Sequence, residues 1–208
     1  MRIATYGEVR AGAPNSRMTR NVLLIDAHPD ADPARFIHAL AEAYAAGATE
    51  AGHAVRRIEL ATLDIPLLRS RGEWQDHAAS PVVRAAQEDI RWATHIAFFY
   101  PLWLGDMPAL LKAFLEQVAR PGFALAEGAM PKPLLEGRSA RIVVTMGMPA
   151  FFYRFYFGAH SVKSFERNIL KLVGIHPVAH SLIGGVEGSA RTRANWLRKM
   201  HALGMAAE

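Results

Sequence analysis

The chain has 208 residues, of which 51% are hydrophobic, and a formal net charge of +5 at neutral pH. This length suits one domain with a substantial core, and no apolar run approaches the roughly 20 residues that cross a membrane. Cysteine is absent, which excludes disulfides, thiolate metal sites and a cysteine nucleophile, so that redox chemistry would need a bound cofactor. Lys and Arg form no block, which argues against nucleic-acid binding and leaves an attraction for phosphorylated small molecules.

The N-terminal stretch differs from the rest of the chain. Residues 1–20 contain Gly, Pro, Asn and Ser without a regular period, and we expect a loose extension before a single domain that spans residues 21–208. The N-terminus lacks the apolar core of a signal peptide, so the expected location is cytoplasmic.

From Asn21 onward, apolar strands alternate with amphipathic helices. The pattern predicts strands at 21–28, 54–60, 96–100, 140–147 and 177–183. It predicts helices at 33–51, 81–93, after Pro108, 160–173 and 189–203, and a short helix within 64–77. Such alternation is typical of a doubly wound α/β fold, here three layers with five parallel strands in the order 2-1-3-4-5.

The loop after the first strand, HPDADPARF, is a candidate phosphate site. His28 and Arg35 could donate to an anion at the positive end of the following helix. Asp30 and Asp32 oppose this, since carboxylates beside a phosphate cost energy, and we expect Asp32 to cap the helix with Pro33 at its first position. Neither GxGxxG nor GxxxxGK[ST] occurs, so the usual dinucleotide and P-loop motifs are absent.

Two further loops follow strands at the same edge of the predicted sheet, where ligands bind in such folds. The stretch after Tyr100 is apolar (Pro101, Leu102, Trp103, Leu104), and it either caps the core or offers backbone amides and an apolar wall to a flat ring. Thr145 and Gly147 end the fourth strand. Gly147 either lets a ligand approach the backbone closely or belongs to an ordinary strand-to-loop turn.

Aromatic residues are dense between Phe151 and His160. They form either core or a wall that stacks a planar substrate, with a Tyr hydroxyl and His160 as polar groups. The other histidines lack metal-ligand spacing, no GxSxG occurs, and no carboxylate pair suggests hydrolysis.

These motifs resemble those of the flavodoxin-like NAD(P)H:quinone oxidoreductases, the group with DT-diaphorase, the modulator-of-drug-activity proteins and the ancillary subunits of potassium efflux systems. The resemblance covers about residues 21–203. It is carried by AHP at 27–29, YPLWLGDMPALLKAFLEQV at 100–118, TMG at 145–147 and GAH at 158–160.

The resemblance implies a tightly bound flavin, FMN or FAD. The phosphate would be held by His28, Arg35 and Phe36, and the isoalloxazine by two loops, Pro101, Leu102, Trp103 and Leu104 on one side and Thr145, Met146 and Gly147 on the other. The family's catalytic Tyr and His match Tyr153, or Tyr156, and His160. Asp32, Pro33 and Ile37 replace the Ser/Thr and Asn of many relatives, which leaves the choice of flavin open.

The implied activity is hydride transfer from NAD(P)H, the co-substrate, to a quinone or similar acceptor. Two alternatives remain: a flavin-bound regulatory subunit docked on a membrane transporter, and a flavodoxin-type electron carrier, although flavodoxins are usually acidic. We also expect a homodimer, because the Leu/Phe-rich helix after Pro108 and the aromatic segment 151–157 exceed what one core would bury. The resemblance places the flavins at that interface, where Glu116 could reach across.

Overall fold

The structure is a computed structural model that describes residues 19–75, 79–128 and 132–208. A five-stranded parallel sheet forms its centre, in the order β2-β1-β3-β4-β5, which confirms the predicted order. Its strands are β1 (Asn21–Asp26), β2 (Ala54–Glu59), β3 (His95–Pro101), β4 (Ser139–Thr145) and β5 (Val178–Ile183). The carboxyl ends of all five strands therefore meet at one edge.

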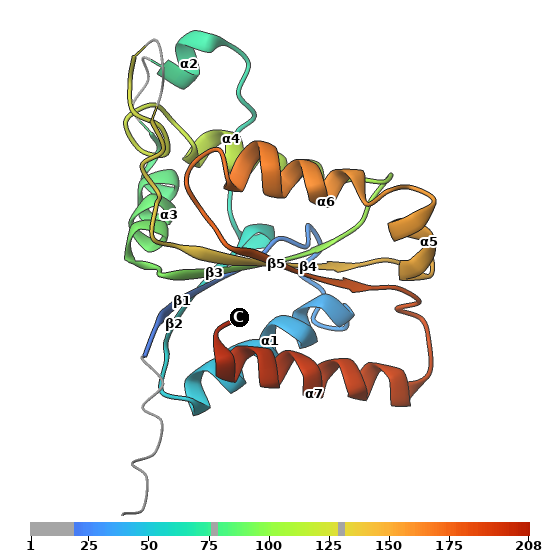
Figure 1. The fold of residues 1–208 in the computed structure, drawn as a ribbon. Helices are drawn as coiled ribbons and strands as arrows, with labels where there is room; N and C mark the ends of the chain where they lie inside the picture. Colours follow the sequence, from blue (N-terminus) through green and yellow to red (C-terminus); the bar gives the residue numbers. More distant parts are fainter. Residues whose placement is uncertain (1–18, 76–78, 129–131) are drawn as a thin grey trace, which may run out of the picture.

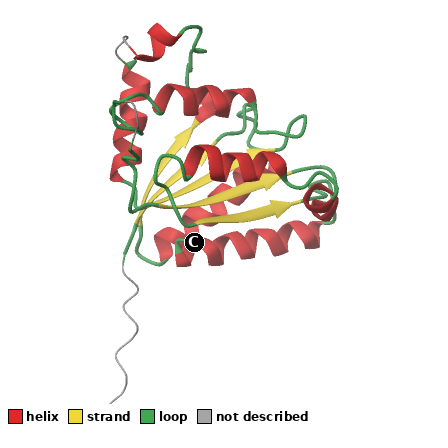
Figure 2. Ribbon diagram, turned by 45° about the horizontal axis from the view of Figure 1, so that its top comes forward, coloured by secondary structure: helices red, strands yellow, loops and turns green. Residues whose placement is uncertain are grey.

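Helices cover both faces of this sheet (Figures 1 and 2). One face carries α1 (Phe36–Glu50) and α7 (Ala190–Ala206), and the other carries α3 (Pro81–Trp92), α4 (Ala109–Val118) and α6 (His160–Ser164). A π-helical segment, Phe165–Leu170, continues α6, and short helices occur at α2 (Arg71–Gln75), α5 (Ala150–Phe155) and the 3₁₀ turn Leu60–Thr62. Among the described residues, no helix is long and apolar enough to cross a membrane.

The sheet separates two hydrophobic cores, because successive strand residues point to opposite faces. In β3 every residue is buried: Phe98 packs with α3 and α4, and Phe99 packs with α1. The Leu/Phe face of α4 is also buried, with Leu111 and Phe114 both at 0% exposure. That face is therefore part of the chain's own core. The prediction that this helix leaves apolar surface for a dimer interface is wrong.

Two glycines let α1 and α7 approach each other closely. A Cβ atom on Gly204 would lie 2.0 Å from the Tyr44 carbonyl oxygen, and one on Gly47 would lie 2.0 Å from the carbonyl oxygen of His201. The helix backbones touch at these two positions, which only residues without a side chain allow.

The start of α1 differs from the prediction. Helix α1 begins at Phe36 with Arg35 as its N-cap residue, and no side chain caps it. Asp32 instead accepts a hydrogen bond from the amide of Ala34, at 2.9 Å, which forms a local turn before the helix. The prediction that Asp32 caps the helix with Pro33 at its first position is wrong, because Asp and Pro favour such turns as strongly as helix starts.

The chain before β1 is tied to the fold at Arg20. Its amide donates to Nδ1 of His53, and its guanidinium donates to the carbonyl oxygen of Ala207. Most of the predicted N-terminal extension, residues 1–18, lies outside the described residues.

Candidate functional site

A cavity of about 360 Å³ opens at the carboxyl edge of the sheet. The loops that follow β1, β3, β4 and β5 all contribute to it. The predicted cofactor-binding residues that line it are His28, Arg35, Phe36, Pro101, Leu102, Trp103, Thr145, Met146 and Gly147. Three loops far apart in the sequence thus converge on one cavity, as the motifs predicted.

The loop after β3 forms a tight hairpin. Trp103 and Asp106 exchange two backbone hydrogen bonds, of 2.9 and 3.0 Å, and both residues between them, Leu104 and Gly105, have positive φ. Leu104 projects fully into solvent at the hairpin tip and does not line the cavity, unlike the prediction, whereas Trp103 is half-exposed beside it.

Two backbone amides of this loop are already engaged. The amide of Leu102 donates to the Thr145 carbonyl oxygen at 2.7 Å, and that of Trp103 donates to Asp106. These two amides are therefore not available to a ligand. Their bonds instead fix the hairpin against β4, so the loop contributes a rigid apolar wall.

The opposite wall comes from the loops after β4 and β5. A Cβ atom on Gly147 would meet no atom within 4 Å, which shows that the backbone borders open space there. The amide of Val186 donates to the carbonyl oxygen of Met146 and so joins the two loops. Val186, Glu187 and Ile37 also line the cavity. Sequence reasoning missed Val186 and Glu187, although their place after the fifth strand was the signal that could have found them.

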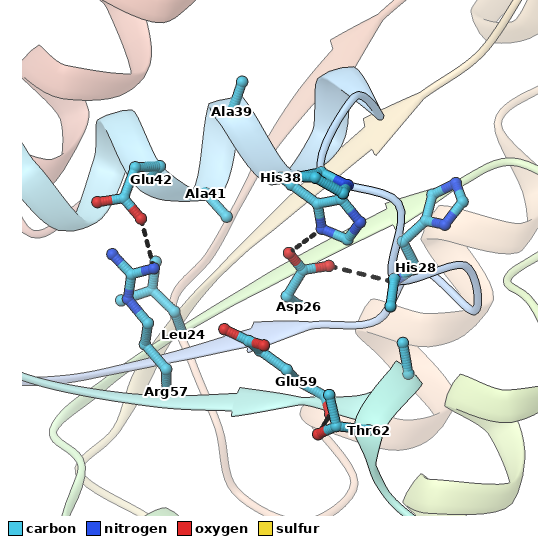
Figure 3. A pocket seen from close by; sticks show the side chains of 13 residues that line it. Leu24, Asp26, His28, His38, Ala39, Ala41, Glu42, Arg57, Glu59 and Thr62 are labelled. Atoms are coloured by element: carbon cyan, nitrogen blue, oxygen red, sulfur yellow. Dashed lines mark hydrogen bonds and ion pairs between the residues drawn. The ribbon is translucent and has the colours of Figure 1, made fainter.

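The loop after β1 is held by a network of charged groups. Arg35 donates to Oδ2 of Asp30 at 2.8 Å and lies 3.6 Å from an oxygen of Asp32, so its guanidinium is only partly available to an anion. The carboxylate of Asp26 accepts from the amide of His28 at 3.2 Å and contacts Nδ1 of His38 at 2.5 Å (Figure 3).

His38, which the sequence predicted to be structural or solvated, bridges β1 and this loop. Its Nε2 lies 2.9 Å from the carbonyl oxygen of Asp30, while its Nδ1 faces Asp26. Burial lowers the pKa of His38, but the hydrogen bonds to Asp26 and Asp30 outweigh it and raise the pKa above its ordinary value. A protonated imidazole can donate from both nitrogens at once.

The pKa of His28 shifts in the opposite direction. Burial lowers its pKa below the ordinary value, and its Nδ1 accepts from the amide of Asp30 at 3.0 Å. The lowered pKa favours a neutral ring, and Nδ1 also lies 3.0 Å from the carbonyl oxygen of Asp30. The ring packs edge-on against Trp103, with 5.7 Å between the ring centroids, so it connects the first and second loops.

The three predicted catalytic residues lie outside this cavity, on and beside α5. Tyr153 is 2% exposed, and its hydroxyl lies 2.6 Å from the Ser161 hydroxyl, which gives it a place in the core. Tyr156 is exposed and stacks on Phe152, with 4.8 Å between the centroids. His160 is exposed at the start of α6. Of the two tyrosines, Tyr156 is thus the one accessible to a substrate.

The site is chemically suited to a flat, largely apolar ring with an anionic tail. Its walls are the Trp103 hairpin and the open backbone at Gly147, and the uncapped start of α1 provides amides for an anion. Among the described residues, no group of three or more His, Asp or Glu side chains could hold a metal ion. The apolar walls of the cavity, its open backbone at Gly147 and the uncapped start of α1 fit a flavin.

Comparison with known proteins agrees with this architecture. The family model Flavodoxin_2, described as "Flavodoxin-like fold", matches residues 20–203. The structure of an NAD(P)H:quinone oxidoreductase from Methanothermobacter marburgensis is similar, with a TM-score of 0.78 and 25% identity over 92% of this chain and 100% of that one. An FMN-dependent NADH-azoreductase from Bacillus anthracis, solved in complex with FMN, has a TM-score of 0.71 and 15% identity, over 88% and 97% of the two chains.

A curated relative matches a shorter stretch. A ribosyldihydronicotinamide dehydrogenase-like protein, traD of Penicillium crustosum, is 33% identical over 70 residues, which are 29% of this chain and 26% of that protein. The family model, by contrast, spans nearly all of the described fold. The chain belongs to the Flavodoxin_2 family of flavodoxin-like proteins.

Proposed function

We propose that this protein is a flavin-dependent oxidoreductase that takes reducing equivalents from NAD(P)H and passes them to a quinone or a similar small acceptor. The observation that carries the proposal is the convergence of three loops on one cavity with open backbone at Gly147. The Methanothermobacter quinone oxidoreductase supports the same activity, and the azoreductase structure with FMN supports a flavin, FMN in the first instance.

Each wall of the cavity has a distinct part in this proposal. Trp103 and Met146 would lie along the flavin ring and exclude water from it, while the first turn of α1 and His28 would hold its phosphate. A bound flavin supplies hydride transfer between the two substrates, and the protein supplies orientation and electrostatics. The partly occupied Arg35 predicts that the helix amides matter more for the phosphate than this side chain does.

Reduction of a quinone leaves negative charge on its oxygen, which needs a donor. His160 and Tyr156 are exposed polar groups of the aromatic segment, and we assign the donor role to them. Tyr153 is assigned a structural role, because its buried hydroxyl is bonded to Ser161.

A homodimer is also part of the proposal. Five aromatic residues of one short segment remain exposed by 41% to 77%: Phe151, Phe152, Phe155, Tyr156 and Phe157. Such a patch is unusual on a monomer, and a second copy of the chain would cover it and bring His160 and Tyr156 toward an enclosed site.

Steady-state kinetics test the activity. Flavin-loaded protein should oxidise NAD(P)H slowly alone and much faster when a benzoquinone is added. Oxidation no faster than that catalysed by the same concentration of free flavin, with and without the quinone, would show that the protein is not a quinone reductase.

A further inference from the structure

A smaller cavity, of about 40 Å³, lies inside the molecule, on the face of the sheet that α3, α4 and α6 cover (Figure 1). Strands β1 and β3 form its floor, and α3, α4 and the π-helical segment Phe165–Leu170 contribute to its other walls. Every residue that lines it is Ala, Val, Ile, Leu or Phe, and no polar surface is exposed inside it. The cavity is thus separate from the flavin site in both position and chemistry.

Main-chain groups at the wall of this cavity already have partners. The carbonyl oxygen of Val118, at the end of α4, accepts from Nε2 of Gln87 at 3.0 Å. That of Ile90, on α3, accepts from Nε of Arg138 at 3.0 Å. A buried water molecule needs two to four polar partners, which this lining does not offer. The cavity therefore excludes water and suits an apolar molecule.

The π-helical wall is a second, independent feature of the site. The amide of Lys171 donates to the carbonyl oxygen of Glu166, five residues earlier, at 2.8 Å. This spacing places one residue more in the turn than an α-helix has, and such turns are rare and frequent at functional sites. Ile169 and Leu170, which lie within the widened turn, both line the cavity. The irregular turn therefore shapes one wall of the cavity.

The size of the cavity selects a very small ligand. A water molecule needs about 10 to 15 Å³, and an apolar cavity of about 150 Å³ binds benzene or xenon. The intermediate volume of this cavity suits an apolar molecule of two or three heavy atoms, such as dioxygen. Phe98 lines the cavity, and Pro101, three residues further along β3, lines the flavin site, so about 10 Å separates the two along the strand.

We propose that this interior cavity binds dioxygen and supplies it to the flavin site. The choice of dioxygen rests on the proposed function, because a reduced flavin can pass electrons to it. In that reaction two electrons and two protons would move from the reduced flavin to dioxygen, which forms hydrogen peroxide and leaves the flavin oxidised. Dioxygen and the quinone would then compete for the same electrons.

Methyl NMR under gas pressure tests the site without flavin or turnover. Dissolved dioxygen is paramagnetic and accelerates the relaxation of methyl groups that it contacts. Ile25 lines the cavity and Ile142 does not, although both are 0% exposed in the same core. Under dioxygen, compared with nitrogen at the same pressure, the δ1 methyl of Ile25 should relax several-fold faster and that of Ile142 should change much less. Equal enhancement at the two methyl groups would overturn the proposal.

Two variants that fill the cavity test its location. Val118→Ile and Val173→Ile each add one methylene group to a residue of the lining. Each should abolish the extra relaxation of Ile25 and raise the melting temperature by about 2 to 4 °C, because the added group regains contacts that the void lacks. Val144→Ile, at a residue 0% exposed in the same core but outside the lining, is the matched control. It should keep the extra relaxation and lower the melting temperature through overpacking. Extra relaxation that persists in both filled variants would refute the site.

Reoxidation by air tests the supply to the flavin. When FMN-loaded protein has been reduced, Val118→Ile should slow its reoxidation by dioxygen and leave turnover with a benzoquinone unchanged. Reoxidation at the wild-type rate would refute the supply of dioxygen from the cavity. Failure of the wild type to bind FMN would instead contradict the proposed function alone, since the relaxation of Ile25 is measured without flavin.

Discussion

At the scale of single residues, substitution of His160 tests the proposed catalytic role most sharply. His160→Ala should lower quinone turnover by about 10- to 100-fold, because a positioned proton donor contributes about this much. Flavin content and melting temperature should hardly change, since His160 is exposed. Tyr156→Phe should give a smaller loss of the same kind.

Tyr153→Phe provides the matched control for these variants. It removes a buried hydroxyl bonded to Ser161, so it should lower the melting temperature and leave turnover intact. Full turnover in His160→Ala, or a turnover loss in Tyr153→Phe as large as in Tyr156→Phe, would contradict the assignment.

His38 leads to a prediction about pH. Its pKa is raised in the folded protein, so the stabilisation it gives is fully present below its ordinary pKa and is lost as the pH rises through the folded-state value. His38→Gln should therefore lower the free energy of unfolding by about 1.5 kcal/mol near pH 6, and by much less near pH 9. Urea denaturation at the two pH values measures this. A difference that does not change with pH would refute the assigned protonation state.

The sequence was informative about site residues where a strand end fixes the position. His28, Trp103 and Gly147 lie in the cavity because each follows a strand whose carboxyl end must meet the others. The partner of His38 was not predicted, because no sequence pattern indicates its contact with Asp26, twelve residues earlier. The sequence could not decide which of Tyr153 and Tyr156 is buried, because that depends on the orientation of α5.

At the scale of elements, the contact between α1 and α7 depends on glycine. Gly204→Ala should destabilise the protein by about 1 to 3 kcal/mol, because the added methyl group would overlap the backbone of Tyr44. This cost exceeds the gain of up to about 1 kcal/mol in helix propensity.

Gly147→Ala is the matched control for this variant. A methyl group there meets open space, so stability should be unchanged while the cavity becomes smaller and flavin binding weaker. Thermal denaturation of both variants would show the contrast, and equal melting temperatures would contradict the close approach of the two helices.

The order of elements followed from the sequence, but several boundaries did not. Apolar runs and their alternation with helices predicted the five-stranded sheet and its order. The predicted start of α1 was three residues too early, because Asp32 and Pro33 form a turn of their own. The hairpin at Trp103 was not predicted, since it depends on positive φ at Leu104, a residue that rarely adopts it.

At the scale of the whole molecule, the exposed aromatic segment predicts self-association. The protein should be a dimer at micromolar concentration by light scattering, and Phe155→Glu should shift it toward the monomer, because a charge in an apolar interface is costly. Leu67→Glu, at an exposed apolar residue elsewhere, should leave the dimer intact. A wild-type monomer would exclude the proposed interface.

Flavin binding is the central claim, and titration of flavin-free protein with FMN tests it most directly. Flavin fluorescence should be quenched to saturation at one FMN per chain, since the ring would lie against Trp103. Gly147→Ala should weaken that binding at unchanged melting temperature. Unquenched FMN and FAD at any protein concentration, with the protein fully folded, would contradict the account.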